Sequence, residues 1–87
     1  MKATREEVYR VIDGERDYQD SMPPSRTDGS IKSVGDYITL MDSMLRSASD
    51  TFYTTPGVTG SLDWIRKVAA ISVRCLEEHG APPRVLK

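Results

Sequence analysis

The chain has 87 residues, with 12 Lys or Arg against 13 Asp or Glu and a formal net charge of -1. A nearly neutral chain has no positive field to concentrate DNA or RNA, so a polymeric nucleic-acid partner is not expected. With one cysteine and one histidine, neither a disulfide framework nor a zinc site can be built within the chain.

The length is that of one small domain, residues 1–87, which buries a limited fraction of its surface when it folds alone. Small domains gain stability from disulfides, metals or oligomerisation, and only oligomerisation is left here. No apolar run reaches the roughly 20 residues that span a bilayer, and no signal peptide is evident. A lone cysteine favours a reducing compartment, so we expect a soluble intracellular protein with no membrane partner.

A first helix is predicted over about residues 4–22. Thr4 and Glu7 have the spacing of a capping box, in which side chains satisfy the free amides of the first turn. One broad face of this helix carries Val8, Val11, Ile12, Glu15, Tyr18, Gln19 and Met22.

Two residues of the first helix break its pattern. Gly14 costs a helix about 1 kcal/mol relative to alanine, and Glu15 lies where an apolar residue is expected. We therefore expect Gly14 to let another backbone come close, and Glu15 to pair with an arginine such as Arg66 or Arg74 in the assembled protein.

The second helix is predicted over about residues 34–53, after a loop at 23–33 that begins with two prolines. Ser33 and Asp36 repeat the capping-box spacing at its start. A continuous apolar stripe follows, made of Val34, Tyr37, Ile38, Leu40, Met41, Met44, Leu45, Ala48 and Phe52.

The third helix is predicted over about residues 61–79, after a loop at 54–60, with Ser61 as its cap and Gly80 at its end before a short C-terminal tail. Its apolar residues sweep about half the circumference, which is more than one neighbouring helix covers: Leu62, Trp64, Ile65, Val68, Ala69, Ile71, Val73, Cys75 and Leu76. We therefore predict an all-α fold, a small three-helix antiparallel protomer that assembles into a compact homo-oligomer.

No catalytic constellation is found in the sequence. A hydrolase needs a nucleophile, a base and an orienting group in contact, whereas Cys75 and His79 share one face of one helix, and we interpret them as a core cysteine and a helix-end histidine. Gly57 and Gly60 lack the Lys-Ser or Lys-Thr of a P-loop. The paired acidic motifs with which all-helical pyrophosphohydrolases hold magnesium are also missing. We expect no enzyme activity, no metal and no cofactor.

A group of residues around the first loop has the chemistry to bind a small nucleotide. An aromatic ring stacks on a base, Arg and Lys bond phosphate, and a helix N-terminus favours an anion. The group consists of Tyr18, Arg26, Thr27, Ser30, Lys32 and Ser33. The alternative is a solvated loop beside a half-buried tyrosine.

Three segments, 15–19, 33–38 and above all 65–84, resemble a family of small phage proteins. These are the anti-CBASS sponges, which sequester cyclic oligonucleotides and so serve viral immune evasion. The likeness extends from about Val8 to Arg84.

The resemblance implies a non-catalytic helical hexamer acting in the cytoplasm of an infected bacterial host. It implies binding of cyclic dinucleotides, of the cyclic GMP-AMP type, between subunits, and in some members of cyclic trinucleotides, of the cyclic tri-adenylate type, on the threefold axis. The family's tyrosine and lysine for the dinucleotide match Tyr18 and Lys32, with Ser33 as a hydroxyl neighbour. Arg66 matches the arginine of the trinucleotide site, and the chemistry of Arg26 adds it to the dinucleotide site.

Two other functions stay open at this point. The half-apolar third helix is also typical of an interaction module that docks a host helix, or of a structural phage oligomer without a ligand. A nucleotide-degrading enzyme is the other alternative.

Overall fold

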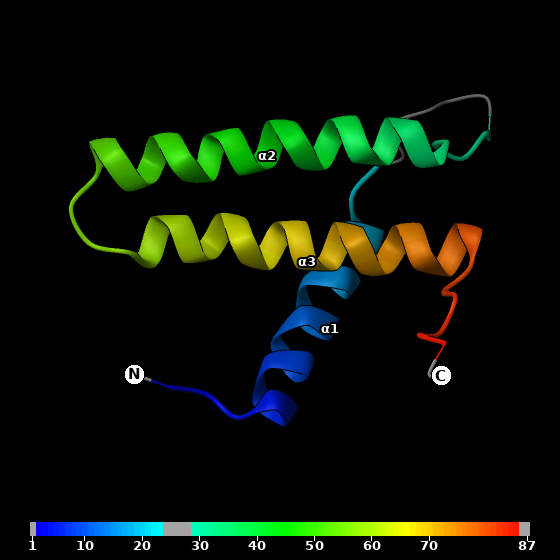
Figure 1. Cartoon of the computed structure of the whole chain (residues 1–87), viewed down its shortest axis with the longest axis horizontal. Helices are drawn as coiled ribbons and strands as arrows, with labels where there is room; N and C mark the ends of the chain where they lie inside the picture. Colours follow the sequence, from blue (N-terminus) through cyan, green and yellow to red (C-terminus); the bar gives the residue numbers. More distant parts are fainter. Residues whose placement is uncertain (1, 24–28, 86–87) are drawn as a thin grey trace.

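The computed structural model describes residues 2–23 and 29–85, which form three helices and no strand. The helices are α1 (Arg5–Ser21), α2 (Val34–Thr54) and α3 (Thr59–His79). Figure 1 shows α2 and α3 side by side and antiparallel, with α1 crossing α3 at a steep angle. The prediction of a small all-α protomer of three helices is confirmed, but the antiparallel arrangement holds for α2 and α3 only, because α1 crosses α3. None of the helices in the described part of the chain is long and apolar enough to cross a membrane.

The first two helices begin at the predicted caps. The Thr4 hydroxyl accepts a hydrogen bond from the Glu7 amide at 3.1 Å and donates to the Glu7 carboxylate at 3.1 Å. At α2 both halves of the capping box are present, because the Ser33 hydroxyl accepts from the Asp36 amide and the Asp36 carboxylate accepts from the Ser33 amide, each at 3.0 Å. Local sequence therefore determines both starts.

The predicted cap of the third helix is wrong. Helix α3 begins two residues earlier, at Thr59, and its N-cap Val58 makes no side-chain hydrogen bond. Ser61 is instead buried inside the first turn, where its hydroxyl donates to the carbonyl oxygen of Ala48 on α2 at 3.2 Å. A buried hydroxyl needs a hydrogen-bond partner, and Ser61 finds its partner on α2. Its side chain therefore does not cap α3.

The core is thin and lies between the two long helices. The buried apolar residues of the described chain are Tyr37 and Ala48 on α2 and Ala70 and Ile71 on α3. The one buried residue of α1 is a charged one, Arg16. Helix α1 therefore lies on the outside of α3 and adds no fully buried apolar side chain.

The chain exposes far more surface than its mass requires. Its accessible surface is 7064 Å², whereas folded monomers of 9.7 kDa expose about 5,100 Å², a difference of about 1,900 Å². The radius of gyration is 14.6 Å, compared with about 12 Å for a compact domain of this length. The fold is open, and large apolar side chains on all three helices face solvent.

The predictions for Gly14 and Glu15, the two residues that break the pattern of α1, have different results. A Cβ atom at Gly14 would meet nothing within 4 Å, so the expectation of a close backbone is wrong within the chain, because this side of α1 faces solvent. Glu15 does pair with Arg66, with its Oε1 at 2.9 Å from Nε. This pair forms inside one chain, so it needs no assembly.

Candidate functional site

The predicted binding residues lie at the C-terminal end of α1 and just before α2. Tyr18 is in the last turn of α1 and is 59% exposed. Lys32 is half-buried, and Ser33 is the N-cap of α2. Arg26 and Thr27 lie outside the described residues. Among the described residues α1 and α2 make no close contacts, since both pack on α3. One chain therefore brings Lys32 and Ser33 together but does not pack the helix of Tyr18 against them.

The start of α2 is fixed to the end of α3. His79 donates from Nε2 to the carbonyl oxygen of Lys32 at 2.7 Å, since a carbonyl oxygen only accepts. The His79 ring also meets the ring of Tyr37 edge-on, with centroids 6.1 Å apart. The Tyr37 hydroxyl donates to the Glu78 carboxylate. Lys32 therefore projects from a backbone that the C-terminal end of α3 holds in place.

Burial and the Glu78 carboxylate both act on Tyr37. The ring is buried, and loss of solvent, followed by the hydrogen bond to Glu78, raises the pKa of Tyr37 to about 12. Tyr37 is thus a neutral hydrogen-bond donor throughout the physiological range. Its role is to join α2 to α3 beneath the candidate site.

The N-terminus of α2 already holds one carboxylate, that of Asp36. The carboxylate accepts a hydrogen bond from the Ser33 backbone amide, and the Ser33 hydroxyl accepts one from the Asp36 backbone amide. The amides of Val34 and Gly35 belong to the first turn, which has no intrahelical acceptor for them. A phosphate at this end would use those two amides rather than the capping pair.

Arg66, the predicted trinucleotide residue, is in a network of carboxylates. Its Nε donates to Glu15 at 2.9 Å, and its Nη1 donates to Asp63 at 2.6 Å. The hydrogen bond to Glu15, followed by that to Asp63, raises the pKa of the guanidinium above its ordinary value. These two bonds leave Nη2 for a further acceptor. An anion that also bound Nε or Nη1 would have to compete with the two carboxylates.

Arg16 forms a bidentate ion pair between α1 and α3, and the sequence analysis missed it. Its Nε and Nη2 donate to the two carboxylate oxygens of Glu77 on α3 at 2.9 and 3.2 Å, and its Nη1 donates to Asp20 at 2.8 Å. The bond to Glu77 raises the pKa of Arg16 and lowers that of Glu77. The spacing of Arg16 and Asp20 was the available signal, but no local pattern indicates Glu77.

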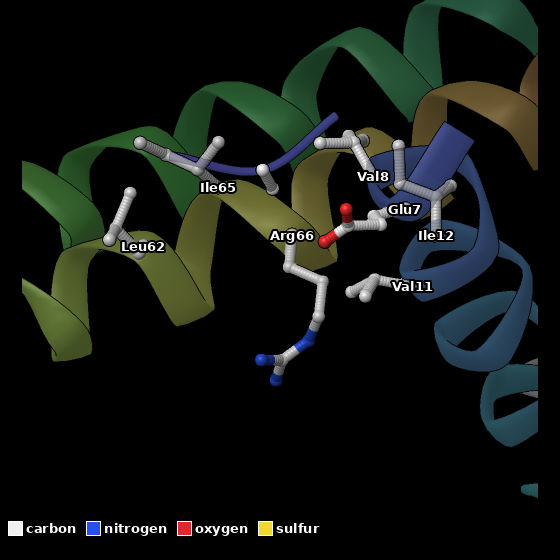
Figure 2. A pocket seen from close by; sticks show the side chains of 9 residues that line it. Glu7, Val8, Val11, Ile12, Leu62, Ile65 and Arg66 are labelled. Carbon is white, nitrogen blue, oxygen red and sulfur yellow. The ribbon is translucent and has the colours of Figure 1, made fainter. Parts of the chain in front are cut away.

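An apolar groove of about 350 Å³ lies between α1 and α3. Figure 2 shows Val8, Val11 and Ile12 on one side and Leu62 and Ile65 on the other. The complete lining is Ala3, Glu7, Val8, Val11, Ile12, Leu62, Ile65, Arg66 and Ala69. The guanidinium of Arg66 extends away from Leu62 and Ile65 (Figure 2). The groove suits aliphatic side chains better than a ring with two phosphates.

The described residues hold no group of three or more metal-ligating side chains of the His, Cys, Asp and Glu types. Cys75 is a half-buried free thiol. Its helix neighbour His79 uses Nε2 on the Lys32 carbonyl. Comparisons with family models, with curated proteins and with solved structures find no match to this chain.

Proposed function

We propose that this protein is a homo-oligomeric sponge that sequesters cyclic dinucleotides, without catalysis, in the cytoplasm of a phage-infected bacterium. The observation that carries the proposal is the excess of exposed surface, about 1,900 Å² over a monomer of this mass. An obligate oligomer buries such surface between its copies. The resemblance of segments 15–19, 33–38 and 65–84 supports six copies and the ligand class.

The dinucleotide pocket is proposed to form where two copies meet. In one chain Tyr18 is exposed on α1 and its helix does not reach α2, so a neighbouring copy is needed to close a pocket around it. A cyclic dinucleotide has two bases and two phosphates in a nearly twofold arrangement. Two copies therefore supply two Tyr18 rings and two Lys32 ammonium groups from one encoded set, with Ser33 next to Lys32. Arg26, which lies outside the described residues, is added to the proposal by its chemistry alone.

The energetics favour a preformed pocket. Stacking contributes about 1 to 3 kcal/mol per base and a charge-assisted hydrogen bond about 1.5 to 3 kcal/mol, so both contacts counted twice give about 5 to 12 kcal/mol. Nanomolar capture needs about 12 kcal/mol. A rigid oligomer avoids the entropy loss of ordering its pocket on binding. The hydrogen bond from His79 to the Lys32 carbonyl oxygen contributes to this rigidity, because it fixes the Lys32 backbone before a ligand arrives.

A second ligand class, cyclic trinucleotides, is proposed to bind at Arg66. Helix α3, which carries Arg66, contains most of the longest resembling segment, 65–84. The two carboxylates bond Nε and Nη1 of Arg66, so Nη2 can donate to a phosphate. Three copies of one arginine around a threefold axis would face a ring with three phosphates.

The experiment that tests the proposal is calorimetric titration of the purified protein with 3′,3′-cyclic GMP-AMP. Tyr18→Ala is expected to weaken binding at least about 30-fold, because two stacking contacts of about 1 kcal/mol or more are lost, and Lys32→Ala is expected to weaken it as well. Tyr9→Ala is the matched control, since Tyr9 is equally exposed on the same helix. Wild-type affinity in both site variants would contradict the proposed site.

Heating the complex separates sequestration from the enzyme alternative, and solution mass separates it from the docking module. A sponge releases the intact cyclic nucleotide in full, whereas an enzyme releases a linear product. An interaction module that docks a host helix stays a monomer or dimer and binds none of the nucleotides.

A further inference from the structure

Helix α2 carries an apolar ridge that is separate from its core face. Val34, which is 47% exposed, lies on this side of α2 one turn before the ridge. The ridge itself consists of Ile38, Leu45 and Phe52, which are 59%, 50% and 54% exposed. They are seven residues apart, close to two helical turns, so their side chains lie in a line along the helix. Tyr37 and Ala48, which face α3, are buried on the adjoining face. The ridge therefore runs beside the α2–α3 contact, and its residues stay half or more exposed.

We infer that α2 of a second copy covers this ridge, antiparallel, about a twofold axis that passes beside Leu45. The inference rests on the self-assembly in the proposed function and specifies one of its interfaces. The ridge is symmetric in sequence about Leu45, with Ile38 seven residues before it and Phe52 seven residues after it. An antiparallel pair places Leu45 against the partner's Leu45, and Ile38 against the partner's Phe52. This contact spans about 21 Å, or about four turns on each helix.

The charges beside the ridge favour the antiparallel arrangement. Asp42 and Ser49 occupy equivalent positions along one edge of the ridge, seven residues apart. In the antiparallel pair each Asp42 carboxylate faces the partner's Ser49 hydroxyl, which can donate to it. In a parallel pair the two edges that carry Asp42 lie on opposite sides of the contact, so neither Asp42 faces the partner's Ser49. The one basic residue nearby, Arg46, already pairs with Asp42 on its own helix at 3.0 Å.

The available area fits one such contact and leaves room for others. A standard interface removes about 800 Å² from each partner, and the excess surface of one chain is about 1,900 Å². The excess is thus larger than the area that one standard contact removes from each chain. The groove between α1 and α3 remains for a second, different contact, as an assembly of more than two copies requires.

Site-specific cross-linking tests the pairing. Cys75, the one native cysteine, is replaced by serine, and single cysteines are introduced by Ile38→Cys, Leu45→Cys, Phe52→Cys and Ser43→Cys. Ser43 is exposed and lies on the side of α2 opposite the ridge, so Ser43→Cys is the matched control. Each variant is first checked for helix content and native mass, then oxidised and run on a denaturing gel without reductant.

The antiparallel pairing predicts one pattern of covalent dimers. Leu45→Cys should cross-link with itself, whereas Ile38→Cys alone and Phe52→Cys alone should not. A co-expressed mixture of these last two variants should cross-link. Strong cross-linking of Ile38→Cys and Phe52→Cys each with itself would show a parallel pair and overturn the inference.

Failure of this inference is distinguishable from failure of the proposed function. A wild-type protein that is oligomeric and binds the cyclic dinucleotide, while Leu45→Cys cross-links no more than Ser43→Cys, rejects the α2 pairing alone. A wild-type protein that is monomeric rejects both. Leu45→Glu, with Ser43→Glu as its control, gives an answer without oxidation, because the paired interface predicts a lower native mass for Leu45→Glu only.

Discussion

Arg16 joins α1 to α3 through a bidentate ion pair. Its guanidinium is buried, holds both oxygens of Glu77 and also bonds Asp20. Bidentate pairs of this kind restrict geometry as well as adding energy, because two parallel N–H bonds allow one orientation. Since α1 buries no apolar side chain completely, this contact and the Glu15–Arg66 pair together orient the helix that carries Tyr18 on α3.

Replacing Arg16 by methionine is expected to lower the free energy of unfolding by about 1 to 3 kcal/mol, since a hydrogen-bonded charge pair is lost from a buried position. Arg46→Met is the matched control, because Arg46 forms its pair with Asp42 at an exposed position, where such pairs contribute about 0 to 1 kcal/mol. Urea unfolding followed by circular dichroism measures both. Equal effects of the two substitutions would contradict the role of Arg16.

The contact between Arg16 and Glu77 also has a predictable pH dependence. Arg16 holds the pKa of Glu77 below its ordinary value of 4.5. A carboxylate whose pKa is lowered in the folded state stabilises that state above its unfolded pKa, and the contribution is lost as the pH falls through the lowered pKa. The difference in stability between wild type and Arg16→Met should therefore shrink below about pH 4.5.

The close approach of α2 and α3 depends on small residues near their connection. A Cβ atom at Gly60 would lie 2.8 Å from the Cγ2 atom of Thr51, which is closer than side chains pack. Threonine is branched at Cβ and has few rotamers to move aside. Ser61, the next residue, lies against Ala48 in the same contact.

Gly60→Ala is expected to destabilise the protein by about 1 to 3 kcal/mol through overpacking. Gly14→Ala, also within a helix but facing open space, is expected to stabilise it by about 1 kcal/mol. The double variant Gly60→Ala with Thr51→Ser removes Cγ2 and should recover most of the loss, which thermal unfolding measures. A stabilising effect of Gly60→Ala alone would show that the contact is loose.

The helices follow from local sequence, and their mutual packing does not. Periodicity and the caps at Thr4 and Ser33 predicted three helices whose observed bounds differ by no more than two residues, because those signals act within one turn. Ser61 was misassigned because its hydroxyl bonds a carbonyl on another helix. Arg16 was missed because its partner Glu77 is 61 residues away in the chain. Of the candidate site, the exposure of Tyr18 and the cap at Ser33 are local features, whereas the separation of α1 from α2 is a tertiary one.

Large apolar side chains of all three helices are exposed. The chain has four buried apolar residues among those described, which is a small core to set against the conformational entropy of ordering the chain. In the proposed oligomer, contacts between copies would add stability that one chain lacks. Stability and ligand capture are then coupled, because the same contacts that complete the fold would build the pocket around Tyr18.

The most direct measurement is native mass spectrometry of the purified wild-type protein, alone and with 3′,3′-cyclic GMP-AMP. We expect an assembly of six chains of 9.7 kDa, which gains the mass of intact cyclic dinucleotide at one site per pair of chains. A chain that stays at 9.7 kDa in dilute solution and gains no mass from the nucleotide would contradict both the assembly and its function.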